Sequence, residues 1–427
     1  MTSTLLRTPA LNSPTIYTLP NGLTIIAEQM PVAAVNLNIW FQVGSIQEND
    51  EINGMAHFLE HMVFKGTPRL ESGAFEKAIE ERGAVTNAAT SQEYTHYYIT
   101  TAPQDFTSLA PLQLEVVLNP SIAAAAFERE KLVVLEEIRR SEDNPQRRIF
   151  IEAIKIGFEN LPYQRPVLGE TTIIEQLQPQ QMRDFHAQWY QPSRMTAVVV
   201  GNLPAQELIA TVADSFSQTY TIKSPSQVLP APKLVAEPSF SEIISREIVN
   251  ETLQQSRLIM LWRVPGLQNL SQTYALDVLA VILGKGKVSR LFRDLREEKE
   301  WVNSIHVSNM NQDVQGLFYF VAQLPKENIE RVEAAILEHI RKIQLDSITD
   351  NELARIRTQV ANRFIMGNER PSDRANLYGY YYSHLRTLEP ALGYPQAIQS
   401  LTSQDLQQAA QRYLPTNAYG RVVVRTA

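Results

Sequence analysis

The sequence contains no cysteine among its 427 residues. This absence excludes disulfides, a catalytic thiol, iron–sulfur clusters and zinc sites built from cysteine. Any metal in this protein must therefore be held by His, Asp or Glu side chains. Histidine is also scarce, with 7 residues in the whole chain, so two histidines within one five-residue window are a feature that needs an explanation.

Positive charge is not in excess, and long apolar runs are missing. The chain has 39 Lys+Arg against 46 Asp+Glu, a net charge of −7, which provides no basic surface for nucleic acid. No apolar stretch approaches the roughly 18 residues that cross a bilayer, so we expect no membrane span. Residues 1–23 hold no apolar core of a secretory signal. We expect a cytoplasmic protein, with an organellar location as the alternative.

The length and the distribution of proline predict two domains. The chain is longer than the roughly 100–200 residues of a typical domain, and its 44% hydrophobic and 20% charged residues are typical of globular proteins. Prolines 225, 230, 232 and 238 lie close together and favour an extended connection. We predict an N-terminal domain at 1–222, a Pro-rich linker at 223–238 and a C-terminal domain at 239–427.

Two segments near the ends of these halves are similar to each other. LQPQQMRDFHAQWYQPSRMTAVVV begins at Leu177, and LTSQDLQQAAQRYLPTNAYGRVVV begins at Leu401. Each is typical of a helix, a Tyr-x-Pro turn and a Val-rich strand, which indicates a duplicated domain. Because strands and helices do not alternate strictly, we predict an α+β fold. Each homologous domain would have a mostly antiparallel sheet with helices packed on one face.

The segment HFLEH at residues 57–61 is the strongest local signal. On a helix, His57 and His61 lie about 40° apart around the axis, so both imidazoles can bind one Zn²⁺. Glu60 lies beside them, where its carboxylate can reach the attacking water, as in the H-x-x-E-H arrangement of inverted zinc peptidases. From the composition, about 0.01 such motifs are expected by chance in a chain of this length.

The residues around this motif predict that its helix is buried. The segment 54–64 is apolar on almost every side, and such a helix belongs in a core. The alternative is an amphipathic helix with two exposed histidines and a solvated glutamate. Two imidazoles and a carboxylate inside an apolar helix require a partner or a metal, so we favour the metal site.

A third ligand is expected on the Glu-rich helix over Phe127–Ser141. Glu130 and Glu137 are seven residues apart, about 20° from the same face, and the residues 132–135 between them are apolar, which indicates burial. Two His and one Glu would leave Zn²⁺ with a net charge of +1, enough to acidify a bound water. From the residues alone, Glu128 and Glu136 compete for this role.

Three segments resemble the pitrilysin family of zinc peptidases: GMAHFLEHMVFKGT (54–67), GAVTNAATSQEYTHYY (83–98) and EREKLVVLEEIRRSEDNP (128–145). The resemblance covers nearly the whole chain and is strongest to the branch of half-size subunits similar to the mitochondrial processing peptidase. In that pattern the third ligand lies 76 residues after the second histidine, which is Glu137 here. The glutamate seven residues earlier, Glu130, would orient the site.

The resemblance also implies an Arg–Tyr pair in the second half that supports the transition state. In RPSDRANLYGYYYSHL, Arg374 and Tyr381 have the family spacing of seven residues. Their expected role is to donate hydrogen bonds to the oxyanion of the tetrahedral intermediate. Arg370, and Tyr378 or Tyr382, are the alternative assignments.

Asn87 and Ala88 match the strand that the family uses as a template for an extended substrate. Where the family pattern begins Gly-Gly, this chain has Gly83-Ala84, which leaves the turn geometry open, and Asn87 could instead cap a turn. In the second half, the place of the zinc motif reads LDVLA at 276–280 and offers no ligand pair. The second half is therefore expected to pack and bind rather than to catalyse.

The resemblance implies a zinc endopeptidase that cleaves peptides or unfolded segments, with Glu60 as general base. Because full-length family members have four such domains, this chain would be half of a clamshell. We expect a homodimer, with the Arg–Tyr pair of one subunit facing the zinc of the other, or a heterodimer with a paralogue. The alternatives are a non-catalytic structural or assembly subunit and a presequence-processing subunit that needs a paralogous partner.

Overall fold

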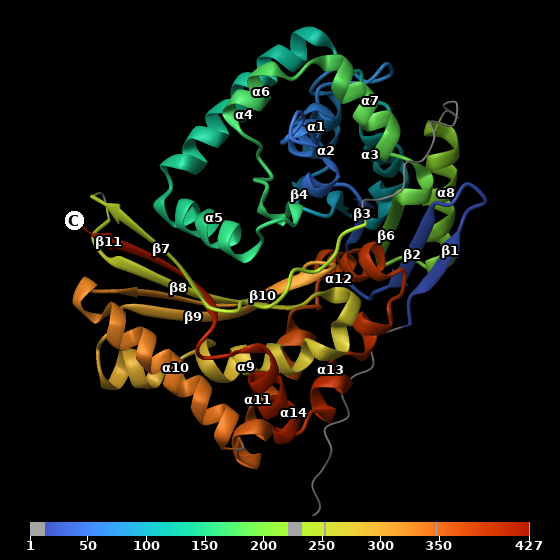
Figure 1. Cartoon of the computed structure of the whole chain (residues 1–427). Coiled ribbons are helices and arrows are strands. Elements are labelled where there is room, and N and C mark those ends of the chain that lie inside the picture. The colour runs from blue at the N-terminus through green and yellow to red at the C-terminus, as the bar shows by residue number, and fades with distance from the viewer. Residues whose placement is uncertain (1–12, 221–232, 252, 347, 427) are drawn as a thin grey trace, which may run out of the picture. The chain divides into compact units, whose positions relative to one another are not determined.

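The computed structural model describes residues 13–220, 233–251, 253–346 and 348–426. Contacts divide the chain into two compact units (Figure 1). Unit 1 comprises the described residues within Met1–Arg140, Arg165–Lys233 and Ile365–Leu392, and unit 2 those within Ser141–Gln164, Leu234–Phe364 and Gly393–Ala427. Each unit therefore combines segments from both predicted domains. The predicted linker at 223–238 lies outside the described residues as far as residue 232.

Unit 1 is built on a six-stranded sheet in the order β1-β2-β6-β3-β5-β4. β2 and β6 run parallel, and the other neighbouring strands run antiparallel. β4 forms one edge of the sheet. The strands are β1 (Thr15–Thr18), β2 (Thr24–Gln29), β3 (Val35–Phe41), β4 (Val85–Thr90), β5 (Thr95–Thr101) and β6 (Met195–Gly201).

One face of this sheet carries most of the helices of unit 1. Leu37 and Ile39 of β3 point to that face and join the apolar core with these helices, because alternate residues of a strand point to opposite sides. The helices of unit 1 on this face are α1 (Met55–Met62), α2 (Ala74–Glu80), α3 (Phe106–Leu118), α4 (Ala124–Asp143), α6 (Thr171–Gln176), α7 (Pro179–Trp189) and α8 (Ala205–Thr219).

The opposite face of the unit 1 sheet is covered by α12 (Pro371–Leu385), which comes from the second half of the sequence. Trp40 of β3 packs there with Tyr378 of α12 in a second apolar cluster. Gly379 makes this close approach possible, because a Cβ at that position would lie 2.1 Å from Trp40 Nε1. Both faces of the central strands are therefore buried.

Unit 2 has a five-stranded sheet in the order β7-β11-β8-β10-β9, with β7 and β11 parallel. Helices α9, α10 and α14 pack on one face, and α5 packs on the other through pairs such as Phe150 and Tyr319. The elements are β7 (Ile243–Asn250), β8 (Ser256–Pro265), β9 (Ser304–Met310), β10 (Gln315–Leu324), β11 (Tyr419–Thr426), α5 (Pro145–Gly157), α9 (Tyr274–Gly284), the π-helix η6 (Phe292–Glu298), α10 (Ile329–Leu345), α11 (Asp350–Met366), α13 (Glu389–Ser400) and α14 (Ser403–Tyr413).

The two sheets have the same topology. The order and directions of β7-β11-β8-β10-β9 repeat those of β2-β6-β3-β5-β4, so the α+β fold with two related sheets is confirmed. The second face of each sheet is covered by a helix from the other half of the sequence, α12 in unit 1 and α5 in unit 2. Among the described residues, no helix has the length and apolar character needed to cross a bilayer.

Candidate metal centre

The predicted motif helix is α1, and it is buried as expected. Gly54 precedes it with φ of 96°, a left-handed conformation that favours glycine. The buried carboxylate of Glu48 accepts hydrogen bonds from Gly54 N at 2.8 Å and Ala56 N at 2.7 Å, so it caps the helix. Burial raises the pKa of Glu48 to about 7, although these hydrogen bonds act to lower it. Gly54 and Glu48 together fix where α1 begins.

His57, His61 and Glu137 come together as a cluster of potential metal ligands. One donor atom from each lies within 4.8 Å of the other two. Glu137 Oε2 is 3.6 Å from His57 Nε2 and 3.5 Å from His61 Nε2. Two imidazole nitrogens and one carboxylate oxygen form a donor set that fits zinc. Among the described residues this is the one such cluster of three or more His, Asp and Glu side chains.

The helix that carries Glu137 is α4, and only part of its apolar stretch is buried. Val134 and Ile138 lie in the core of unit 1. Leu132 is 67% exposed and Val133 is 50% exposed, so the expectation that the whole stretch 132–135 is buried was wrong. At 100° per residue, position 132 lies about 160° from 130, on the opposite side of the helix, and position 133 lies about 60° from 130, at the edge of the buried face beside Glu137. The Glu137 side chain is itself 42% exposed.

Glu130 contacts the second histidine of the motif, in the place expected for an orienting residue. Its Oε1 lies 3.0 Å from His61 Nδ1, and its Oε2 lies 2.8 Å from Lys65 Nζ. Burial acts to raise the pKa of Glu130, but the hydrogen bonds from Lys65 and His61 outweigh it and lower the pKa. An ionised Glu130 can only accept a hydrogen bond, so Nδ1 of His61 carries the ring proton and donates to it. This leaves the lone pair of His61 on Nε2, facing Glu137.

Glu60 lies on the same helix and contacts β4. Its Oε2 accepts a hydrogen bond of 2.5 Å from the hydroxyl of Thr90. Burial raises the pKa of the Glu60 carboxyl, while the hydrogen bond from Thr90 and the charge of His61 lower it. The other carboxylate oxygen, Oε1, is free of this hydrogen bond.

Asn87 and Ala88 lie in β4, the edge strand next to α1. Along β4, exposed and partly buried residues alternate, so Asn87 points to solvent and Ala88 packs against the core of unit 1. The Asn87 side chain accepts a hydrogen bond from Ala88 N at 2.9 Å. Among the described strands, none pairs with the outer edge of β4.

Arg374 and Tyr381 lie on α12. Arg374 donates to Glu28 at 2.6 Å and, through Nε and Nη2, to the carbonyl of Asn368 at 3.2 and 2.9 Å. Tyr381 is half-buried, and its ring lies 5.4 Å from that of Tyr380. The hydroxyl of the alternative candidate Tyr378 is buried and donates to Glu28 at 2.7 Å. The contacts of Arg374 therefore belong to the α12 face of the sheet and not to the metal-ligand cluster.

The segment 276–280 in unit 2, expected at the place of the zinc motif, lies in α9 and supplies no comparable cluster. Its one ionisable residue is Asp277, which accepts hydrogen bonds from Asn309 at 2.8 Å and Tyr394 at 3.2 Å. Burial raises the pKa of Asp277 to about 6. This carboxyl has hydrogen-bond partners within unit 2 and is structural.

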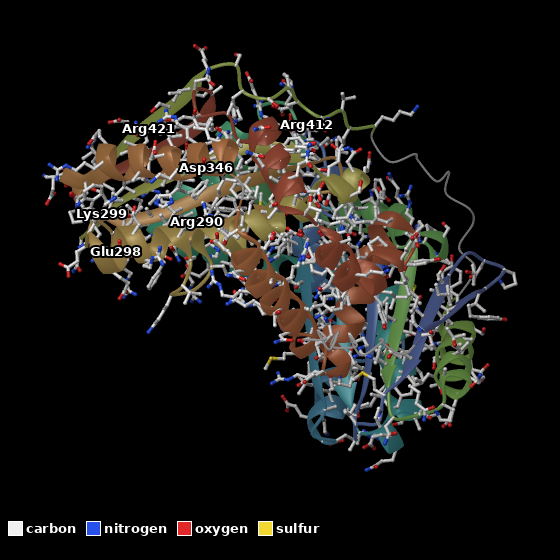
Figure 2. All side chains as sticks on the ribbon, turned by 90° about the horizontal axis from the view of Figure 1, so that it is seen from below. Arg290, Glu298, Lys299, Asp346, Arg412 and Arg421 are labelled. Atoms are coloured by element: carbon white, nitrogen blue, oxygen red, sulfur yellow. The ribbon has the colours of Figure 1, made fainter. Side chains whose placement is uncertain are left out.

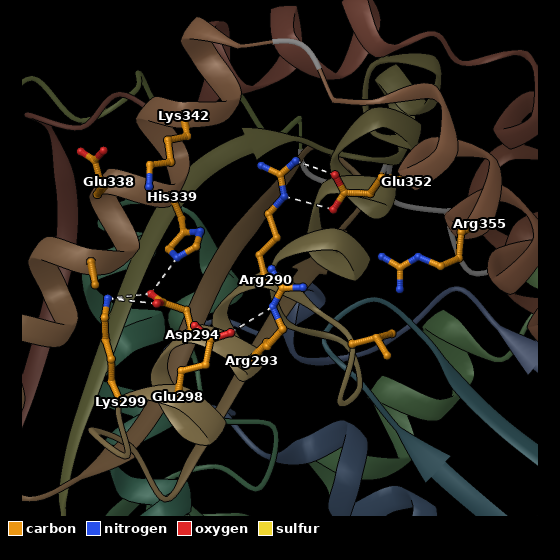
Figure 3. A pocket seen from close by; sticks show the side chains of 12 residues that line it. Arg290, Arg293, Asp294, Glu298, Lys299, Glu338, His339, Lys342, Glu352 and Arg355 are labelled. Atoms are coloured by element: carbon orange, nitrogen blue, oxygen red, sulfur yellow. Dashed lines mark hydrogen bonds and ion pairs between the residues drawn. The ribbon is translucent and has the colours of Figure 1, made fainter.

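A pocket of about 580 Å³ in unit 2 is lined mainly by charged side chains (Figure 3). Figure 2 shows Arg290, Glu298 and Lys299 close together in this region. Glu352 is held by Arg290 at 2.6 Å, and Asp294 by Lys299 and His339 at 3.0 Å each. Because these carboxylates already have cationic partners, the pocket does not resemble a metal site.

A buried H-x-x-E-H helix facing a glutamate of a second helix is the arrangement typical of the inverted zinc peptidases. The comparisons agree with this class. A model of the insulinase family, peptidase family M16, matches residues 23–171, and a model described as the peptidase M16 inactive domain matches residues 176–360. The chain belongs to peptidase family M16, as the resemblance to the pitrilysin family predicted.

Individual relatives match over almost the full length. The chain is 30% identical over 419 residues to an uncharacterized zinc protease of Mycobacterium bovis, covering 96% of this chain and 93% of the relative. The crystal structure of a protease from Helicobacter pylori is 26% identical, with a TM-score of 0.90 over 97% of this chain and 99% of that one. A peptidase M16 inactive domain from Pseudomonas fluorescens, 19% identical, matches in fold with a TM-score of 0.86 over 98% and 99%.

Sequence reasoning missed three residues that contact this centre. Glu48 caps α1 from a position six residues before Gly54, which is not the spacing of a capping box. Lys65 pairs with Glu130 across 65 residues of chain, and Thr90 reaches Glu60 from a different element. The position of Lys65, one helical turn beyond His61, was the one available signal, and a lysine there is more often solvated.

Proposed function

We propose that this protein is a zinc-dependent endopeptidase that hydrolyses peptides or unfolded protein segments. The observation that carries the proposal is the cluster of His57, His61 and Glu137, with Glu60 beside it on the same helix. These three side chains would hold Zn²⁺, and two His with one Glu form a known catalytic set. When bound, zinc supplies a Lewis acid that polarises the scissile carbonyl and acidifies water.

In this proposal Glu60 acts as the general base. Because Thr90 occupies Oε2, Oε1 is the atom that would take the proton from the attacking water and pass it to the leaving amine. Glu130, paired with Lys65, would hold the His61 ring in the tautomer that presents Nε2. These roles need no side chain from unit 2.

The free edge of β4 would bind the substrate. An extended peptide can add to this edge through main-chain hydrogen bonds to the segment that includes Asn87 and Ala88. A folded segment cannot present its backbone in this way, so the enzyme would prefer unfolded substrates and show little dependence on side chains.

The active form would be a dimer that encloses the substrate. We propose a homodimer, in which Tyr381 of one subunit would assist the oxyanion at the centre of the other. Arg374 would act indirectly, since its hydrogen bonds to Glu28 and Asn368 hold α12 in place. Analytical ultracentrifugation of the active enzyme tests this, and a fully active monomer would refute the dimer.

Zinc content and peptide cleavage together test the catalytic proposal. Purified protein should bind one zinc per chain and cleave a mixed peptide library, as detected by mass spectrometry, and a chelator should abolish the cleavage. Glu60→Gln should keep zinc and lose cleavage, whereas Glu137→Gln should lose both. Glu128→Gln is the matched control, because this exposed residue of α4 pairs with Lys131 and should affect neither. A Glu60→Gln variant that retains turnover would contradict the role of base.

A further inference from the structure

We infer that Thr90 is the positioning residue that ties the general base Glu60 to the substrate-binding strand β4. This inference rests on the proposed function and deepens it. Thr90 is the last residue of β4, and its hydroxyl donates to Glu60 Oε2 at 2.5 Å. The bond joins the strand that would receive the peptide to the side chain that would take the proton.

Thr90 is itself held in place by the sheet. Its backbone pairs in register with Thr95 of β5. Thr95 is fully buried, and its hydroxyl donates to the carbonyl of Val43 at 2.9 Å and lies 3.4 Å from the Thr90 hydroxyl. Because Thr95 is anchored in this way, the Thr90 side chain has a rigid neighbour on its inner side.

The hydrogen bond selects one orientation of the Glu60 carboxylate. With Oε2 engaged by Thr90, Oε1 is the oxygen left for the reacting water. Without this bond the carboxylate would keep its smaller interaction with the Thr90 backbone N–H. It could rotate more freely about its last torsion, which is broad, and would spend less time in the reactive geometry. A small loss of alignment in a reacting group reduces turnover strongly.

The bound peptide and the general base would then both be positioned by the same strand, β4. A peptide that adds to β4 has its scissile bond placed by the register of that strand, and Thr90 places Glu60 relative to the same strand. Removing the hydroxyl should therefore lower kcat, while leaving peptide affinity and KM nearly unchanged, since the β4 backbone is unaltered.

The test compares Thr90→Val, which removes the hydroxyl at nearly constant shape, with Thr90→Ser, which keeps it. We expect Thr90→Val to lower kcat by about 10- to 100-fold, as loss of a hydrogen bond to a charged group does, with KM changed less than about twofold and one zinc per chain retained. Thr90→Ser should restore most of kcat. Thr100→Val is the matched control, because it removes a threonine hydroxyl of β5 that accepts from Asn36 and does not contact Glu60.

A second measurement does not depend on activity. In crystal structures of the metal-free variants, the Glu60 carboxylate should hold one position in Thr90→Ser and several in Thr90→Val. If the wild type is active and Thr90→Val is equally active, or if the Glu60 carboxylate holds the same single position in the Thr90→Val crystal, the role of Thr90 is overturned. The proposed peptidase function would still stand. A zinc-loaded wild type without chelator-sensitive cleavage would overturn the proposed function and the catalytic meaning of Thr90 with it.

Discussion

The ion pair of Glu28 and Arg374 lets the structural role of Arg374 be measured separately from any catalytic one. The Glu28 side chain is 1% exposed and that of Arg374 is 11% exposed. Replacing Arg374 by Met leaves the buried carboxylate with the Tyr378 hydroxyl as its remaining described donor. Breaking a buried ion pair from one side costs about 3–5 kcal/mol, because the other charge stays desolvated.

This loss should be large enough to see in thermal unfolding. For a unit of this size, each kcal/mol shifts Tm by about 2–4 °C, so Arg374→Met should lower Tm by roughly 6–20 °C. The double variant Glu28→Gln, Arg374→Met should regain at least about 2 kcal/mol, since a neutral Gln still accepts from Tyr378 without a buried charge. Urea unfolding of the four proteins of this cycle gives the coupling free energy.

Arg139→Met serves as the control for loss of an arginine. Arg139 is 72% exposed and pairs with Glu136 on α4, and an exposed pair contributes about 1 kcal/mol or less. A loss below about 1 kcal/mol in Arg374→Met, with cleavage strongly reduced, would refute the reasoning and favour a direct role of Arg374 in the reaction.

Three further changes test the surroundings of the site. Burial lowers the pKa of His96 to about 4. Below about pH 6.5 the imidazole therefore takes up a proton in the unfolded chain but not in the folded protein. The free energy of unfolding then falls with pH, by about 2 kcal/mol at pH 5. In urea unfolding of the metal-free proteins between about pH 7.5 and 5, His96→Gln should therefore lose about 2 kcal/mol less unfolding free energy than the wild type. An equal loss in both proteins would contradict the lowered pKa of His96. Lys65→Met should weaken zinc binding about 10-fold in chelator competition, whereas exposed Lys77→Met should not. Gly54→Ala should destabilise the protein by about 2 kcal/mol or more and reduce zinc content, because its Cβ would lie 2.7 Å from the Leu168 carbonyl. Gly73 also has a positive φ, but a Cβ there would have nothing within 4 Å, so Gly73→Ala should lower the unfolding free energy by only about 1 kcal/mol. Equal losses in the two variants would contradict a steric overlap at Gly54.

The sequence indicated that the domain is duplicated, but not which helices cover each sheet. The repeat that begins at Leu177 and Leu401 indicated duplication, and the two sheets have the same topology. The crossing of α12 into unit 1 and α5 into unit 2 had no sequence signal, because both helices are bounded by the same caps and periodicity whichever sheet they cover. The partner of an amphipathic helix is chosen by packing and not by its own pattern.

The sequence by itself determined the motif part of the site. His57 and His61 share a face through the geometry of one helix, and the absence of cysteine limited their possible co-ligands to His, Asp and Glu. The spacing within α4 placed Glu130 and Glu137 on one stripe but left Glu128 and Glu136 as rivals, and the resemblance to a family was needed to choose.

The tertiary structure decided what surrounds each of these side chains. It brought Glu137 to both imidazoles, Lys65 to Glu130, Thr90 to Glu60 and Arg374 to Glu28. These pairs join residues from about 30 to almost 350 positions apart in the chain. Helical periodicity carries information over a few turns only, so contacts at such separations depend on how the sheet and its helices pack.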